Sequence, residues 1–506
     1  MGACSFFREV PQHTDEVAQD DDAIAVRCQC NTKDLDAETW RLSFFQGELL
    51  SVDDLDKLND EDFLGYCVVR RVKLPNEPER RIWVYEAVVR WQPLLNNYLH
   101  CCSVFTSSVA GREFRVKGGY FAQQNGLTYV CCQSALKMVL KHMKELLRQD
   151  KSYADINAAL GIDHRKSGVG TYAGQSAGGV DFGRIEDLFS SLAVRLEPRE
   201  YYFDPSKPHA GVTDIVYPYV ESGLPALLFF KGSGAQEGHV IPVVGHTCNS
   251  DSWVPLAEKG YGIPTVPTYS TASWADHLVV HDDNYGMYMC LARDCLCRWQ
   301  VPSACAPAAT GMPAATLQPQ AEFSPLSVVV LLPQAVNRSP LNVEMVSAVI
   351  LQAAFEQCLP TGERWQRRLR DAFMGADEPP VLRTFLSSKA LYVRHMETAR
   401  DSVGATVGDA FIEELKKQLP DTFWISEITL RDLYSGNHRK LGEILSDAAM
   451  ADVTDPNHFG ASWLTLRVPG IGLVRSADKT SVSPFDVPLN GHTGLLRLLS
   501  PRPNEW

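Results

Sequence analysis

Three kinds of side chain that together activate a sulfur nucleophile follow one another along the chain. The pair Cys131 and Cys132 comes first, His239 follows, and Asp282 comes last. In such a set the imidazole takes the thiol proton and the carboxylate holds the ring in position. Each residue alone is more often structural than catalytic, because small thiols are commonly buried and acidic residues commonly cap turns. Their order and their placement at the ends of predicted elements favour catalysis.

The cysteine pair stands at the start of a predicted amphipathic helix. Between residues 131 and 150 apolar side chains recur at spacings of three and four, and basic residues, Lys137 among them, take the opposite face. A thiol at a helix N-terminus lies at the positive end of the helix dipole, which favours the thiolate. Free backbone N–H groups of the same turn can hold a developing oxyanion. We therefore expect one of the two cysteines to be the nucleophile.

Three predicted strands carry the base and the carboxylate. Residues 225–230 and 240–245 are apolar runs typical of buried strands, and the glycine-rich segment between them puts His239 at the mouth of the second strand. Residues 278–281 predict a third strand, which runs into the polar turn 282–286. A histidine and an aspartate at the ends of neighbouring strands can face one cleft.

Around these residues the chain resembles the papain-like cysteine peptidase superfamily, and within it the bacterial C39-like branch. That branch carries a glutamine shortly before a Cys-Gly-Pro-x-x-Leu-x-Met-x-Leu pattern, which Gln124 and Cys-Cys-Gln-Ser-Ala-Leu-Lys-Met-Val-Leu at 131–140 match in part. Residues 238–245 resemble the Gly-His strand that bears the family's base, and 282–286 resemble its Asp-x-x-x-Gly turn. The resemblance covers roughly residues 115–300.

The resemblance implies a fold and a set of roles. The expected fold class is α+β, with a papain-like core in which the nucleophile helix packs on an antiparallel sheet carrying the histidine and the aspartate. Cys131 would be the nucleophile, His239 the base, Asp282 its orienting partner and Gln124 the oxyanion donor.

Two positions leave alternatives open. Cys132 stands where the family has glycine, so a register shifted by one residue would make Cys132 the nucleophile instead of Cys131. The family's glutamine usually lies about six residues before the cysteine, whereas Gln124 lies seven before Cys131. Gln123 is therefore an alternative oxyanion donor.

The implied activity is hydrolysis of a peptide or isopeptide bond through a thioester intermediate. The same triad supports acyl transfer of the transglutaminase kind and glutamine deamidation, because only the second nucleophile differs. A non-catalytic papain-like binding or regulatory module is a further alternative, although such proteins usually lose a triad residue and this chain keeps all three. We expect a protein or peptide substrate, no cofactor and no metal, and the sequence predicts no oligomeric state.

Length and composition predict several domains around this core. With 506 residues the chain exceeds what one hydrophobic core usually organises. The expected parts are a flexible acidic leader, a small β-rich domain, the catalytic domain, an alanine- and proline-rich linker or loop, and an α/β C-terminal region: 1–23, 24–110, 111–305, 306–325 and 326–506. In the last part, 342–359 and 408–419 predict helices, and 422–430 and 463–468 predict strands.

Charge and cysteine content exclude several partners. The net charge of −13 argues against nucleic acid and anionic lipid surfaces. The longest apolar run falls short of the roughly 20 residues that cross a bilayer. The N-terminus lacks the pattern of a secretory signal, so a cytoplasmic location is expected, and there the 14 cysteines would be reduced.

Other motifs point to chemistry less well. The Cys-x-Cys pairs Cys28/Cys30 and Cys295/Cys297, with Cys290 and Cys305 near the second, fit the spacing of structural zinc sites poorly. The glycine-rich segment 168–183 is interpreted as a loop flanking the cleft. A metal-binding role for Asp276, His277 and His281 is less favoured than strand packing.

Overall fold

Two compact units, each of mixed α and β structure, make up the chain. The structure, a computed structural model of residues 1–506, describes the ranges 2–10, 15–75, 77–91, 97–143, 150–162, 182–191, 196–203, 211–232, 238–248, 268–293, 299–301, 321–357, 364, 367, 370–371, 379–400, 404, 406–431, 433–434, 439–455, 458, 461–485 and 496–497. Unit 1 comprises Met1–Val212, Leu224–Gly245 and His277–Leu331, and unit 2 comprises Thr213–Gly223, His246–Asp276 and Leu332–Trp506.

This division differs from the predicted domains. The expected β-rich domain and most of the expected catalytic domain lie together in unit 1. The hairpin of β6 (Ser103–Val109) and β7 (Arg112–Phe121) spans the predicted boundary at residue 110, so no break in packing occurs there. Sequence alone located no such pairing, because the turn between the two strands has the composition of a domain boundary.

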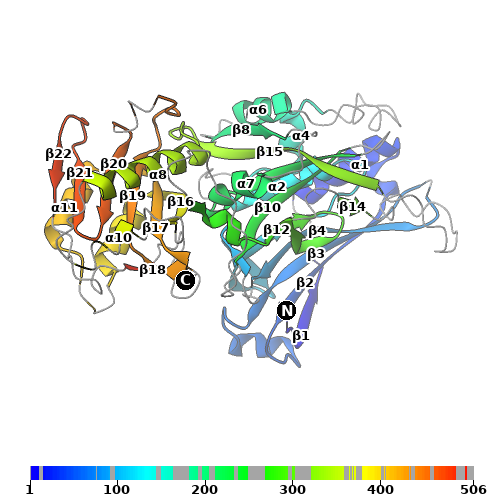
Figure 1. Ribbon diagram of the computed structural model, residues 1–506. Coiled ribbons are helices and arrows are strands. Elements are labelled where there is room, and N and C mark those ends of the chain that lie inside the picture. Colours follow the sequence, from blue (N-terminus) through cyan, green and yellow to red (C-terminus); the bar gives the residue numbers. More distant parts are fainter. Residues whose placement is uncertain are drawn as a thin grey trace. The chain divides into compact units, whose positions relative to one another are not determined.

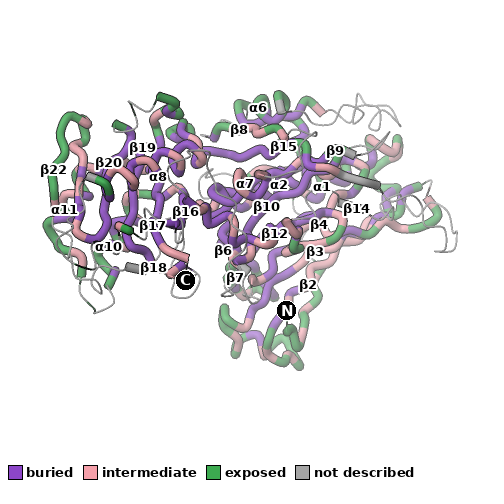
Figure 2. The backbone as a smooth tube through the Cα atoms, in the orientation of Figure 1, coloured by how far each residue is buried: buried purple, intermediate pink, exposed green. Residues whose placement is uncertain are grey.

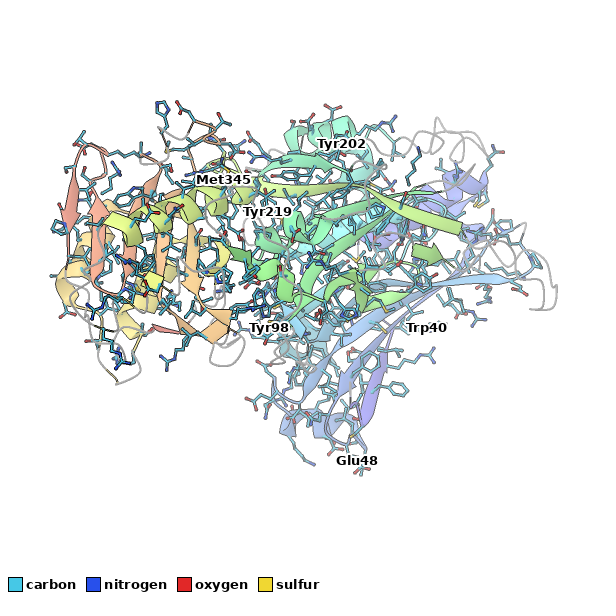
Figure 3. All side chains as sticks on the ribbon, in the orientation of Figure 1. Trp40, Glu48, Tyr98, Tyr202, Tyr219 and Met345 are labelled. Carbon is cyan, nitrogen blue, oxygen red and sulfur yellow. The ribbon has the colours of Figure 1, made fainter. Side chains whose placement is uncertain are left out.

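The first sheet of unit 1 is antiparallel and has the order β1-β2-β3-β4-β7-β6 (Figure 1). Its other strands are β1 (Ser5–Glu9), β2 (Asp36–Phe45), β3 (Phe63–Lys73) and β4 (Arg80–Arg90), with the short 3-10 helices η1 (Thr32–Asp34) and η2 (Val52–Lys57) between them. The rings of Phe45, Phe63 and Phe114 meet at centroid distances of 5.3 to 5.4 Å in its core. On the sheet surface Trp40, labelled in Figure 3, packs between the guanidinium groups of Arg8 and Arg71.

The predicted flexible leader is wrong over its described part. Residues 5–9 form β1, and α1 (Asp15–Cys28) begins inside the acidic segment. Two of the acidic side chains bind partners that are distant in the sequence. Asp21 forms an ion pair with the buried Arg70, and Asp20 accepts a hydrogen bond of 2.8 Å from Thr128. An acidic run was interpreted as solvated, whereas two of its carboxylates are buried.

The second sheet of unit 1 carries the residues of interest. Its order is β13-β12-β10-β9-β15-β14, with β5 paired to β10 and β8 paired to β15. The strands are β5 (Asn97–Leu99), β8 (Leu196–Tyr202), β9 (Ala226–Gly232), β10 (His239–Thr247), β12 (His277–Asp282), β13 (Gly286–Ala292), β14 (Trp299–Val301) and β15 (Ala321–Pro333). The predicted strands at 225–230, 240–245 and 278–281 are confirmed as β9, β10 and β12. Most of β10 is buried (Figure 2), which explains its unbroken apolar run.

Helices α2 (Cys131–His142), α4 (Tyr153–Ala159) and α6 (Phe182–Ser191) complete unit 1, and α2 contacts both β7 and β9. The end of the predicted linker, 321–325, belongs to β15, and the remainder up to residue 320 lies outside the described residues. The glycine-rich segment 168–183 also lies outside them, apart from its last two residues.

Unit 2 is built on a sheet with the order β11-β16-β17-β19-β20-β21-β22. Its strands are β11 (Tyr269–Ser270), β16 (Val381–Ser388), β17 (Thr422–Thr429), β19 (Gly442–Asp447), β20 (Trp463–Val468), β21 (Ile471–Arg475) and β22 (Val482–Pro484), and β18 (Arg439–Lys440) pairs with β23 (Leu496–Arg497). Its helices are α7 (Val212–Glu221), η3 (Thr271–Trp274), α8 (Pro340–Gln357), α10 (Lys389–Thr398) and α11 (Asp409–Gln418). The two helices and two strands predicted in this region are confirmed.

A row of buried charges crosses the middle of this sheet. Strand register places Arg383 beside Glu427, Glu427 beside Glu443 and Glu443 beside Arg467. Lys440 lies between the two glutamates, 2.7 Å from Glu427 Oε1 and 3.2 Å from Glu443 Oε2. Charged residues in a strand usually face water, so this row could not be predicted from residue types alone.

Candidate active site

The nucleophile candidate occupies the first turn of α2. The residue before the helix, Val130, has no side chain able to cap it, and its own N–H donates to Gln133 Oε1 at 3.2 Å. The first N–H groups of a helix have no acceptor inside the helix. N–H groups at the start of α2 point out of the helix and can donate to a bound group. The helix ends at His142, and residues 144–149 of its predicted extension lie outside the described residues.

Burial separates the two cysteines. Cys131 is half-buried, whereas Cys132 is 5% exposed and burial raises the pKa of its thiol well above the ordinary value. Lys137, expected on a solvated face, is buried and forms an ion pair of 3.0 Å with Glu16 of α1. The face of α2 that carries Lys137 is therefore buried as well. Of the two thiols, the half-buried one of Cys131 is the one that solvent can reach.

His239 is the first residue of β10, where the sequence predicted it. It pairs with Phe230 of β9, and its side chain is buried. Its Nε2 lies 3.3 Å from Asp282 Oδ1, and Cys131 is close enough to the ring to raise the pKa of His239. Burial by itself lowers the pKa of His239, but Asp282 and Cys131 outweigh this effect and raise the pKa well above 6.5. The structure thus brings the three predicted residues together.

The turn after β12 fixes the carboxylate. Asp282 Oδ1 accepts a hydrogen bond of 2.8 Å from the backbone N–H of Asn284, and the carbonyl of Asp282 accepts one from Tyr285. Gly286 closes the turn at a φ of 137°, which side chains other than glycine rarely adopt. This local chemistry holds one carboxylate oxygen toward His239.

Neighbouring residues tie this turn to the first sheet of unit 1. His281 Nδ1 lies 3.1 Å from the carbonyl of Tyr120, and a Cβ on Gly119 would meet the His281 ring at 2.7 Å. The hydroxyl of Tyr288 accepts from Gly119 N at 2.6 Å and donates to Val89 O at 2.7 Å. Burial lowers the pKa of His281 to about 4. His281 is therefore a neutral packing residue, as the sequence favoured.

The two glutamines differ in what they bind. Gln123 Oε1 accepts from the backbone N–H of Val84 at 2.9 Å, so its side chain serves β4. Gln124 Nε2 donates to Asn284 Oδ1 at 2.8 Å, and Asn284 Nδ2 lies 3.4 Å from His239 Nε2. Gln124 is thus linked to the histidine through Asn284, a residue that sequence reasoning placed only in a polar turn.

Asp283 is the second residue that sequence reasoning missed. It is 2% exposed, and neither carboxylate oxygen has a hydrogen-bond partner. Its Oδ1 lies 3.7 Å from His239 Nε2. Burial raises the pKa of Asp283 to about 7, against the lowering effect of His239 and with a further increase from Asp282. The sequence feature that could have pointed to Asp283 was the pair of adjacent aspartates, because a turn needs only one of them.

Replacing Asp283 by Asn is expected to stabilise the protein more at pH 8 than at pH 5. A carboxyl whose folded pKa lies above its unfolded value near 3.8 contributes stability below that value and loses it as the pH rises through about 7. Between pH 5 and 8 the wild type should lose roughly 2 to 3 kcal/mol relative to the variant. Urea unfolding with a chelator present measures this. An equal difference between the two proteins at both pH values would contradict it.

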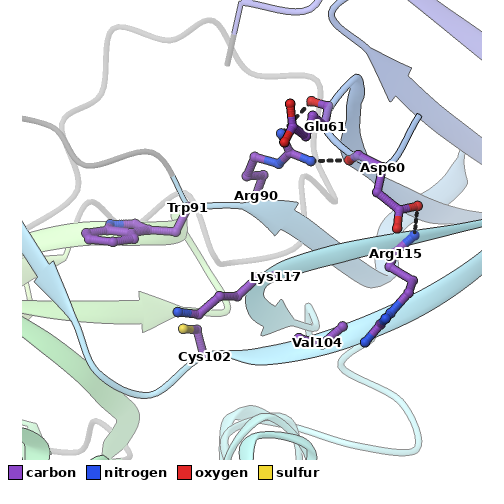
Figure 4. A pocket seen from close by; sticks show the side chains of 8 residues that line it. All are labelled: Asp60, Glu61, Arg90, Trp91, Cys102, Val104, Arg115 and Lys117. Carbon is purple, nitrogen blue, oxygen red and sulfur yellow. Dashed lines mark hydrogen bonds between the residues drawn. The ribbon is translucent and has the colours of Figure 1, made fainter. Parts of the chain in front are cut away.

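A separate hollow of about 380 Å³ lies on the first sheet of unit 1 (Figure 4). Its lining includes Arg90, Arg115 and Lys117, with none of the triad residues. Two charged side chains of its lining, Arg90 and Asp60, hold neighbouring backbone groups. Arg90 donates to the carbonyls of Asp60 and Glu61, and Asp60 Oδ1 accepts from the backbone N–H of Arg115 at 2.8 Å. The hollow therefore has no geometric link to the candidate chemistry.

The discounted zinc motifs divide between described and undescribed residues. Cys28, Cys30 and Cys290 carry free thiols, and none belongs to a group of three candidate metal ligands among the residues described. Cys295, Cys297 and Cys305 lie outside the described residues.

Comparison with known proteins gives no relative for this arrangement. No family model matches the chain, and neither a curated protein nor a solved structure matches it significantly. None of the helices in the described ranges is long and apolar enough to cross a membrane. The functional argument therefore depends on the site itself.

Proposed function

We propose that this chain is a cysteine-dependent amide hydrolase of papain-like type, acting on a peptide or isopeptide bond of a protein or peptide substrate. The observation that carries the proposal is the position of His239, whose Nε2 lies 3.3 Å from Asp282 Oδ1 and whose ring is close enough to Cys131 for that side chain to raise its pKa. A thiol, a base and an orienting carboxylate in contact are the minimum set for nucleophilic catalysis by cysteine.

In the proposed reaction Cys131 attacks the carbonyl carbon, and His239 takes the thiol proton. Asp282 keeps the ring oriented and stabilises the imidazolium. The oxyanion is held by N–H groups of the first turn of α2 and by Gln124, whose amide nitrogen has a second N–H besides the one that it donates to Asn284. His239 then protonates the leaving amine, and water hydrolyses the thioester with the same histidine as base.

Two further observations support the papain-like part of the proposal. The nucleophile candidate stands at the N-terminus of α2, and the base and carboxylate stand at ends of β10 and β12, which neighbour each other in an antiparallel part of the sheet. No disulfide joins the ten cysteines of the described ranges, in keeping with a reducing compartment such as the cytoplasm.

The test is the rate at which each cysteine of the full chain reacts with iodoacetamide between about pH 5 and 8, read by peptide mass in the presence of a chelator. Cys131 is expected to react fastest, and Cys131→Ala should remove the fast phase. Cys132→Ala is the matched control, because it deletes the adjacent thiol and should leave the fast phase in place. Loss of the fast phase only in Cys132→Ala, or in neither variant, would refute the assignment.

A peptide library incubated with wild type and Cys131→Ala then separates hydrolysis from the other outcomes of a thioester. Cleaved peptides that need Cys131 support hydrolysis. Amine-linked products support acyl transfer, and conversion of glutamine to glutamate supports deamidation. Fast labelling of Cys131 without any Cys131-dependent product would favour a binding module and would contradict the proposed hydrolase.

A further inference from the structure

Three carboxylate oxygens beside His239 are buried without a hydrogen-bond partner. They are Asp282 Oδ2 and both side-chain oxygens of Asp283. Both aspartates are almost fully buried, and a buried carboxylate is strongly unfavourable unless a cation or a set of donors accompanies it. The single imidazole of His239 cannot satisfy all three oxygens, so the site is short of positive charge.

The spacing of these groups is that of ligands around a small cation. One ligand atom from each of His239, Asp282 and Asp283 can be chosen so that all three lie within 4.8 Å of one another. His239 Nε2 lies 3.3 Å from Asp282 Oδ1 and 3.7 Å from Asp283 Oδ1. Ligands at the usual zinc distances of about 2.0 to 2.2 Å are separated by about 3.4 Å in a tetrahedral site. The site therefore needs little movement to close around an ion.

We propose that His239, Asp282 and Asp283 bind a divalent transition-metal ion of the zinc type. An imidazole nitrogen with two carboxylates suits zinc better than calcium or magnesium, which prefer oxygen ligands alone. Three protein ligands leave a fourth position open to water or to a thiolate. The half-buried side chains of Cys131 and Asn284 mark the side from which an ion can enter.

The ion would switch the candidate active site off, a consequence that depends on the proposed function. A metal on Nε2 replaces the proton that the ring shares with Asp282, and its charge makes the other nitrogen a weaker base. His239 then takes the Cys131 proton less readily. Because a metal ion binds the deprotonated forms of its carboxylate and imidazole ligands, metal binding should weaken in acid.

The binding test is a titration of the chelator-treated, reduced full chain with Zn²⁺ in competition with a chromogenic chelator. Asp283→Asn and Asp282→Asn should each weaken one site at least tenfold. Asp56→Asn is the matched control, since this aspartate in the same unit is 89% exposed, and it should bind as wild type does. The two variants together guard against a local folding defect in one. Equal affinity in wild type and both variants, or displacement of zinc by excess Mg²⁺, would overturn the assigned site.

Iodoacetamide labelling of Cys131 tests the switch separately. Zinc at saturating concentration should slow labelling at least tenfold, and a chelator should restore it. Zinc that binds in an Asp283-dependent manner without slowing Cys131 would overturn the regulatory role and leave the site standing. Slow labelling of Cys131 even with a chelator would refute the proposed catalytic function, while the zinc titration would still decide the metal site.

Discussion

Replacing His239 by Asn is expected to slow the alkylation of Cys131 at neutral pH by about a hundredfold or more and to abolish any amide hydrolysis. A positioned base contributes roughly 10² to 10⁴ in rate. In the variant no group takes the thiol proton, and the interaction of the ring with Cys131 is lost. The measurement is the second-order rate constant for iodoacetamide at Cys131, read by peptide mass.

The pH profile gives the same prediction a second readout. The pKa of His239 is raised well above 6.5, so the imidazolium that accompanies a Cys131 thiolate persists to higher pH than an ordinary histidine allows. The stabilisation from this charged ring is complete below about 6.5 and is lost as the pH rises through the folded pKa. In His239→Asn the part of the labelling profile that depends on this imidazolium should be absent.

His277→Asn is the matched control for this variant. It makes the same change in the same unit at the start of β12, and His277 is only half-buried. It should leave the rate and the pH profile at Cys131 unchanged. A His239→Asn protein that labels at the wild-type rate with an unshifted profile would show that the histidine does not act on this thiol.

The strands around the site could be predicted because their signals are local. Apolar runs of strand length, bounded by glycines or by a polar turn, gave β9, β10 and β12, and the glycine-rich segment gave the position of His239. The start of α2 at Cys131 followed from helical periodicity. Each of these needs only neighbouring residues to decide it.

The parts that failed depend on partners distant in sequence. Asp20 and Asp21 are buried in α1 because Asp20 accepts a hydrogen bond from Thr128 and Asp21 pairs with Arg70. No local property of an acidic run reveals those partners. Lys137 was placed in solvent for the same reason. The resemblance already placed Cys131 ahead of Cys132; burial favours the same residue, which periodicity alone does not decide for two adjacent positions.

Asn284 and Asp283 show a further limit. Both were visible in the turn sequence, but the turn explained them without chemistry. Only the fold brings Asn284 to Gln124, and only burial makes the lack of a hydrogen-bond partner at the Asp283 oxygens costly. Residues that a local motif already accounts for are thus the easiest functional residues to overlook.

Replacing Glu443 by Ala is expected to destabilise unit 2 by about 3 to 5 kcal/mol. Glu443 accepts hydrogen bonds from Arg467 at 2.5 and 2.8 Å and from Tyr392 at 3.0 Å, and it lies 3.2 Å from Lys440. Every one of these groups is buried. Arg467 and Lys440 hold the pKa of Glu443 well below its usual range although burial opposes this. Removing the carboxylate leaves their positive charges in the interior with too few partners.

The balance of charges explains why one substitution should matter so much. Arg383, Lys440 and Arg467 face an equal number of carboxylates, Glu221, Glu427 and Glu443, all within unit 2. Loss of one carboxylate gives the buried cluster a net positive charge. Glu443→Leu combined with Arg467→Leu removes one charge of each sign and should recover part of the loss, because a buried pair is costly mainly when only one partner is removed.

Hydrogen exchange read by mass spectrometry suits this measurement, since two units need not unfold in one transition. Peptides from β17, β19 and β20 should lose protection in Glu443→Ala, while peptides from β2, β3 and β4 in unit 1 should keep theirs. Glu413→Ala is the control, because its ion pair with Lys416 is exposed to solvent and should contribute little to stability. If both variants exchange like the wild type in unit 2, the charge row contributes no more than a surface ion pair, and the sheet of unit 2 is held by its two apolar cores alone.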